Sequence, residues 1–126
     1  MIVSSFFENV ARHAAEHREL RPGEAPENLV LKFSPQPPQD MWIACLVSYW
    51  TPPAGSDEEP FWSFAAVTDE PLPEVAAAGH DRTIIALRPE NVETWLTPAA
   101  HTLDALDQVL EDKACPFYEH ELAKAA

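Results

Sequence analysis

Basic residues are scarce in this sequence. Eight lysines and arginines stand against twenty-one aspartates and glutamates, which gives a formal net charge of −13 at pH 7. From Met41 to the end of the chain, four basic residues stand against fifteen acidic ones. A surface of this charge repels phosphate backbones at long range, so general affinity for nucleic acid is disfavoured. A local basic pocket is still compatible with it, because salt screens charges beyond roughly 8 Å.

Cysteines and long apolar runs are also few. Cys45 and Cys115 can form one disulfide bond at most and no disulfide framework. We therefore expect a reducing, cytoplasmic compartment. The longest apolar run, Met41 to Val47, is far shorter than the roughly 20 residues of a membrane-spanning helix. The amino end has no basic segment ahead of an apolar stretch, so the sequence predicts a soluble, unexported protein with no membrane partner.

Only three glycines stand beside thirteen prolines, while 46% of the residues are hydrophobic. With 126 residues, this composition predicts one rigid, loop-rich α+β domain with a modest core. Runs rich in β-branched and aromatic residues predict strands over 2–7, 28–34, 41–50, 61–68 and 83–87, with 41–50 and 61–68 as an antiparallel hairpin. Helix patterns predict helices over 10–20, within 69–79, from Pro89 and over 103–110, the last capped by Thr97 or Thr102. Residues 115–120 are predicted to return to the sheet.

Aromatic side chains gather in the predicted hairpin, where two uses compete for them. The cluster comprises Trp42, Tyr49, Trp50, Phe61, Trp62 and Phe64. Such side chains can stack nucleic-acid bases. Packing in a core or an interface is their more common use, so the sequence favours that interpretation.

The segment that contains His13, Glu16 and His17 spells H-x-x-E-H. In inverted zinc peptidases, two histidines of this pattern bind zinc and the glutamate activates water. A third ligand would have to come from His101, His120 or a glutamate, and no spacing selects one. The competing interpretation is a solvated short helix with two incidental histidines. It is favoured because only three letters of the motif are informative, so a chance match is common. We therefore expect no metal and no cofactor.

The most informative stretch runs from Gly79 to Leu96. Gly79 stops a predicted short helix and leaves His80 in a turn ahead of a β-branched strand. Pro89 then suits the first position of the next helix. His80 is thus predicted to lie in a loop held between packed elements, where scaffolds usually keep their chemical groups.

The order of segments around this stretch is distinctive. It comprises Ser63 to Pro71, a short helix, His80-Asp81-Arg82, an apolar strand, Arg88-Pro89-Glu90 and Trp95-Leu96. This order resembles the second half of the SOS response-associated peptidase (SRAP) family, whose members carry an "iHdRmPviL.pe…WL" stretch. Upstream, Trp42 to Trp50 and, more loosely, Met1 to Glu8 resemble two further strands of that family.

The resemblance implies a mostly antiparallel β-sheet or partial barrel with three to four short helices. It also implies that residues 1–126 form a single SRAP-like domain without the amino-terminal half of the family fold, as a fragment of a longer chain or a shortened paralogue. Such a domain would expose apolar sheet surface. We therefore expect self-association or a complementing chain as a partner.

The family recognises abasic sites in single-stranded DNA, and its amino-terminal cysteine joins the sugar aldehyde as a thiazolidine. That ring needs an amine and a thiol on neighbouring carbons. Here Met1-Ile2 opens the sequence, and Cys45 and Cys115 have their amines in peptide bonds. The resemblance therefore implies a role in abasic-site recognition or processing during the SOS response, with the covalent link to DNA lost and the chain inactive in crosslinking.

Two catalytic positions of the family have counterparts here, Glu8 and His80. In the family these groups move protons during imine formation and sugar ring opening, work that suits a carboxylate and an imidazole. Arg82 would contact the DNA phosphate. The simpler interpretations are a turn histidine that satisfies backbone groups and an arginine paired with Asp81 or a glutamate. Two alternatives remain for the whole chain: a non-enzymatic acidic module that binds a protein partner, and the zinc hydrolase.

Overall fold

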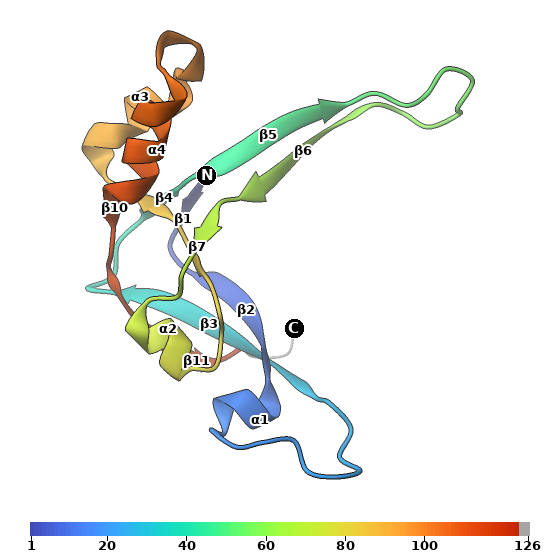
Figure 1. Cartoon of the computed structure of the whole chain (residues 1–126), viewed down its shortest axis with the longest axis vertical. Coiled ribbons are helices and arrows are strands. Elements are labelled where there is room, and N and C mark those ends of the chain that lie inside the picture. Colours follow the sequence, from blue (N-terminus) through green and yellow to red (C-terminus); the bar gives the residue numbers. More distant parts are fainter. Residues whose placement is uncertain (124–126) are drawn as a thin grey trace.

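The computed structural model describes residues 1–123 as an α+β arrangement of short elements (Figure 1). Within these residues the α-helices are α1 Arg12–Ala15, α2 Pro73–Ala77, α3 Val92–Leu96 and α4 Leu103–Glu111, with short 3-10 helices η1 Pro89–Asn91 and η2 Pro98–Ala100. All strand pairs in the described part of the chain are antiparallel, and the sheets there do not close into a barrel. The predicted α+β class with three to four short helices is confirmed.

The central sheet contains three strands in the order β11–β3–β2. Their bounds are β2 Phe6–Ala11, β3 Asn28–Gln36 and β11 Phe117–Leu122. Alternation along the strands turns apolar side chains to one face, where the ring of Phe33 stacks on that of Phe6 at a centroid distance of 5.1 Å. Helix α2 packs Val75 into the same buried cluster. We call this sheet with α2 the body of the molecule.

Smaller sheets adjoin the body. One has the order β1–β4–β9–β10, with β1 Ile2–Val3, β4 Met41–Ile43, β9 Ala86–Leu87 and β10 Lys113–Ala114, and β7 Thr68–Asp69 pairs with β8 Thr83–Ile84. Three residues that each lie between two consecutive strands connect these sheets through a cycle of backbone hydrogen bonds. The N–H of Ala44 donates to the carbonyl of Ile85 (3.0 Å), that of Ile85 to the carbonyl of Val67 (2.9 Å) and that of Val67 to the carbonyl of Ala44 (2.9 Å). Ala44 and Ile85 are buried there with Val109 of α4, and Trp95 packs against them.

A long hairpin projects from this junction and is called the arm, residues 45–66 (Figure 1). It consists of β5 Cys45–Trp50 and β6 Phe61–Ala66, paired as predicted. Most of its side chains are exposed, Trp62 by 70%. Core packing of the arm's aromatic side chains is therefore wrong, because the strand predicted over 41–50 breaks at Ala44 and only β4 enters the interior. Interface packing of these side chains stays a prediction.

The helix predicted over residues 10–20 is also wrong at both of its ends. Val10 belongs to strand β2, where pairing with β3 leaves it 1% exposed. Helix α1 occupies only Arg12–Ala15, and His17 has a φ of +51°, which a helix does not allow. Burial of Val10 against the body sheet thus outweighed the local helix preference.

Several local predictions are confirmed. Helix α2 has a proline at its start, Thr102 accepts a hydrogen bond from Ala105 N–H as the cap of α4, and β11 pairs with β3. Both cysteines are free thiols. No helix within residues 1–123 combines the length and apolar character needed to cross a membrane.

Candidate functional site

Glu8 lies on the core-facing side of strand β2. The alternation Phe6, Glu8, Val10 places the three side chains on one face, and both apolar neighbours are buried. Glu8 stands opposite Leu31 of β3. A carboxylate on this face loses hydration and needs a polar or charged partner. Packing alone would favour an apolar side chain at this position.

That partner is His80. Its Nε2 lies 3.3 Å from Oε2 of Glu8, and both side chains are largely shielded, at 18% and 24% exposure. His80 follows α2 in the chain, whereas Glu8 comes from β2. The structure therefore brings together the two residues that the sequence predicted as a pair.

The other ring nitrogen of His80 faces the backbone of Arg82. Nδ1 is 2.9 Å from the Arg82 carbonyl oxygen and 3.3 Å from the Arg82 nitrogen. These contacts exclude each other, because Nδ1 either carries a hydrogen or accepts one. The shorter contact favours Nδ1–H donating to the carbonyl. Nε2 then faces Glu8, either as a free lone pair or, when protonated, as a donor to the carboxylate.

Gly79 fixes the approach of the histidine loop to the body. Its φ is +92°, a conformation that side chains disfavour. A Cβ added here would lie 2.9 Å from both the Ala14 carbonyl carbon and the Ala15 nitrogen. The loop before His80 thus touches the backbone of α1, the helix that directly follows β2. The sequence analysis recognised Gly79 as a helix stop but missed this contact.

Two side-chain hydrogen bonds hold α2, and with it the histidine loop. Leu72 N–H donates to the buried Thr83 hydroxyl oxygen (2.9 Å), which ties the start of α2 to β8. Tyr118 N–H donates to the Glu74 carboxylate (2.9 Å), which ties the helix to β11. His80 is therefore held on a supported loop. Such support is what a precisely placed chemical group requires.

Arg82 is exposed beside this pair. Within residues 1–123, no carboxylate lies at ion-pair distance from its guanidinium, so the predicted salt bridge to Asp81 or a glutamate is absent there. Its carbonyl orients His80. The guanidinium remains available for an anionic ligand.

The H-x-x-E-H segment does not assemble a metal site. Helix α1 ends before Glu16, and the Glu16 carboxylate contacts Arg18 at 2.6 Å and Arg12 at 3.6 Å. The hydrogen bond from Arg18 lowers the pKa of Glu16. The described part of the chain contains no group of three His, Cys, Asp or Glu residues placed to hold a metal ion. The geometry of an inverted zinc peptidase is therefore not formed by these residues.

Comparison with known proteins gives one match. The profile of a family described as "SOS response associated peptidase (SRAP)" matches residues 2–124, a range that includes Glu8, His80 and Arg82. No curated protein and no solved structure matches the chain.

Proposed function

This chain belongs to the SOS response associated peptidase (SRAP) family, and from that premise we propose that it binds abasic sites in single-stranded DNA, with Glu8 and His80 as its proton-transfer pair. Family membership supports a role in the SOS response and an association with abasic-site DNA. The observation that carries the assignment of residues is the 3.3 Å contact between the Glu8 carboxylate and Nε2 of His80. A carboxylate on a core-facing strand position has no packing rationale, whereas an acid/base pair accounts for it.

The proposed reaction is the opening of the abasic sugar ring. An abasic sugar rests mainly as a closed hemiacetal, whose aldehyde is masked. The Glu8 carboxylate takes the proton of the C1 hydroxyl, and protonated Nε2 of His80 gives its proton to the ring oxygen. The bond between C1 and the ring oxygen breaks as the C1 carbonyl forms. Glu8 then returns its proton to His80 across their direct contact, which restores the pair with no net oxidation.

Arg82 supplies the proposed contact to DNA. The net charge of −13 disfavours binding along the general surface. The Arg82 guanidinium, which has no carboxylate partner among residues 1–123, is proposed as a local exception, because an arginine can bind phosphate in a bidentate manner. We therefore expect weak binding with a small footprint, centred on the abasic nucleotide.

We propose that neither Cys45 nor Cys115 crosslinks to abasic DNA. The thiazolidine needs a free amine next to a thiol, and the sequence offers Cys45 and Cys115 only within peptide bonds. We also propose that the chain forms a single SRAP-like domain. Either a second copy or a complementing chain would then cover its exposed apolar strands.

Ring opening can be measured directly with abasic single-stranded DNA and an aminooxy aldehyde probe. At saturating probe, opening limits the rate of oxime formation, so the plateau rate reports on opening alone. We expect the protein to raise this plateau, and His80→Gln and Glu8→Gln each to abolish the rise. His101→Gln and Glu90→Gln, at exposed positions outside the site, are the matched controls and should retain it. A plateau unaffected by the wild-type protein would refute the proposed function.

The binding and crosslinking proposals have separate tests. Arg82→Gln should weaken binding of abasic DNA and reduce the salt dependence of the affinity by about one phosphate contact. An unchanged salt dependence would contradict the role of Arg82. A denaturing gel after incubation with abasic DNA should show no shifted protein band, and a stable shifted band would contradict the absence of crosslinking.

A further inference from the structure

The arm is a sheet of two strands with no third strand beside it in the described residues. β5 and β6 pair only with each other, so both outer edges carry unpaired backbone groups. Neither strand contains a charged residue or a proline. Those are the features by which proteins protect exposed strand edges, and an isolated two-stranded hairpin is only marginally stable in water. The arm therefore requires a covering partner.

The two faces of the arm differ in chemistry. One face, called the aromatic face, carries Val47 opposite Phe64 and Tyr49 opposite Trp62, whose rings lie 4.9 Å apart. All four side chains are at least half exposed. The other face carries Leu46 opposite Ala65 and Trp50 opposite Phe61, but Ser48 opposite Ser63 separates these two apolar pairs. The aromatic face is thus the continuous apolar surface, and large exposed surfaces of this kind mark interaction sites.

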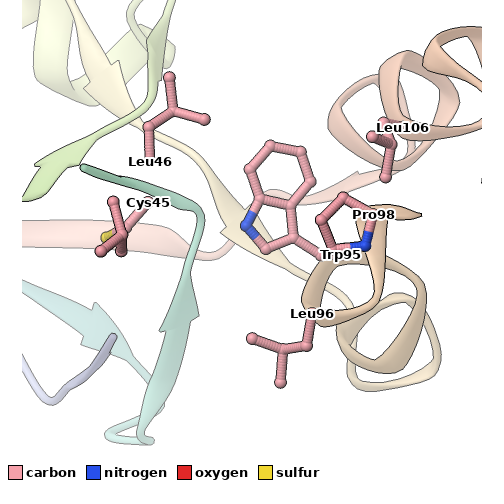
Figure 2. A pocket seen from close by; sticks show the side chains of 7 residues that line it. Cys45, Leu46, Trp95, Leu96, Pro98 and Leu106 are labelled. Carbon is pink, nitrogen blue, oxygen red and sulfur yellow. The ribbon is translucent and has the colours of Figure 1, made fainter. Parts of the chain in front are cut away.

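The aromatic face continues into a groove at the base of the arm. A cavity of about 370 Å³ lies between β5 and the helices α3 and α4, and the indole of Trp95 forms one wall (Figure 2). A second cavity of about 180 Å³ borders the same indole and shares Cys45 and Val47 with the first. The contact surface therefore extends beyond the hairpin and offers room for side chains of a partner.

We propose that the aromatic face joins two copies of this chain in a two-fold symmetric dimer, with the two arms antiparallel. The four side chains together expose on the order of 500 Å² per copy. Two copies would then bury on the order of 1,000 Å², the lower bound for a specific interface. The groove beside Trp95 adds to this area. A face that contacts its own copy in this way is self-complementary, as two-fold symmetry requires.

Charge decides where two copies can meet and favours the antiparallel arrangement. Two chains of net charge −13 repel each other, so they can meet only where charge is absent, and the arm strands are uncharged. The loop at the tip carries Asp57, Glu58 and Glu59. Antiparallel arms place the two acidic tips at opposite ends, whereas parallel arms would bring them together. The same charge disfavours nucleic acid as the partner of this face.

The mass in solution tests the dimer. Size-exclusion chromatography with light scattering should show a concentration-dependent shift from the chain mass of 14.0 kDa to twice that mass. Phe64→Lys should hold the protein at the single-chain mass. Ser63→Lys adds the same charge at the neighbouring residue on the opposite face, so it should retain the dimer. Circular dichroism verifies that both variants are folded.

Salt and a milder substitution sharpen this test. Raising the salt concentration should tighten the dimer, because it screens the repulsion between two acidic chains. Phe64→Ala, which adds no charge, should weaken dimerisation at least tenfold. A single-chain mass at every concentration, masses that grow beyond two chains, or equal effects of Phe64→Lys and Ser63→Lys would each overturn the proposal. Glu8→Gln should leave the dimer unchanged, so failure of the dimer and failure of the proton-transfer pair are distinguishable.

Discussion

The body and the arm use similar side chains with opposite results. Phe33 in the body sheet is 0% exposed, whereas Phe64 in the arm is 66% exposed. Both phenylalanines belong to antiparallel strands with regular partners. The difference lies in what covers the sheet, because α2 packs on the body and no described element packs on the aromatic face.

This contrast separates strand formation from burial. Pairing needs only neighbouring backbone, and it occurs in both regions. Stability needs apolar area removed from water, and only the body achieves that within one chain. The body can therefore hold the Glu8–His80 pair rigidly, while the arm presents a surface. The two regions should respond differently to the same substitution.

The largest difference is expected for phenylalanine truncation. Phe33→Ala removes a ring that stacks on Phe6 in the core, so it should lower the free energy of unfolding by roughly 3–5 kcal/mol. Phe64→Ala, measured at protein concentrations where the chain is a monomer, should change it by no more than about 0.5 kcal/mol. Denaturant unfolding gives both values. Equal losses would show that the arm is buried within a single chain.

Two glycines provide the next comparison. Gly79 and Gly55 both have positive φ, +92° and +89°, so alanine at either should cost roughly 1–2 kcal/mol of backbone strain. Only Gly79 also meets α1, whereas nothing lies within 4 Å of a Cβ at Gly55 in the arm loop. Gly79→Ala should therefore destabilise the protein more than Gly55→Ala does.

The same pair of variants tests the site. Displacing the loop from α1 should move His80 away from Glu8, so Gly79→Ala should lower the plateau rate of oxime formation while Gly55→Ala leaves it unchanged. Equal stability and equal rates for the two variants would show that the contact with α1 does not position His80.

Local chemistry explains what the sequence could predict of the fold. A proline start and a glycine stop defined α2, and Thr102 defined the start of α4. These signals act within a few residues, so no tertiary information was needed. The helix predicted from Val10 failed because burial of Val10 is decided by β3, which lies elsewhere in the chain. Core packing of the aromatic cluster was a wrong prediction because composition does not reveal whether a sheet is covered.

The site was predicted from the order of motifs rather than from geometry. The resemblance selected Glu8 and His80, and the structure places them in contact, but their catalytic role stays a prediction. The Arg82 carbonyl that orients His80 has no sequence signal. One available signal was overlooked, the alternation Phe6, Glu8, Val10. If the strand predicted over 2–7 had been extended past Phe7, the alternation would have placed the Glu8 carboxylate on an apolar face.

A helix cap gives a smaller effect than either pair above. Thr102 accepts a hydrogen bond from Ala105 N–H at the start of α4, so Thr102→Ala should cost about 1 kcal/mol of stability. Thr97 donates its hydroxyl hydrogen to the Glu93 carbonyl at the end of α3 and caps no N–H group. Thr97→Ala should therefore cost less than Thr102→Ala in thermal unfolding. The reverse order would contradict the assignment of Thr102 as the cap.

The smallest expected effect is on the pH dependence of stability, compared between an acidic residue in the loop before β3 and one in the arm. Glu24, in the loop between α1 and β3, accepts hydrogen bonds from Arg18 (2.6 and 2.8 Å) and from Arg21 N–H (2.9 Å), and these lower its pKa from 4.5 to about 2. A carboxyl group whose pKa is lower in the folded state stabilises the protein above the unfolded pKa and loses that contribution as pH falls. Glu24→Gln should therefore destabilise the protein at pH 6, and the deficit relative to wild type should shrink between pH 4.5 and about 2. In the arm, the Glu58 carboxylate accepts a hydrogen bond within the described residues only from the Ser56 hydroxyl (3.2 Å), so Glu58→Gln should have the lesser effect at pH 6. A deficit for Glu24→Gln that stays constant down to pH 2 would show that Arg18 does not hold the carboxylate in solution.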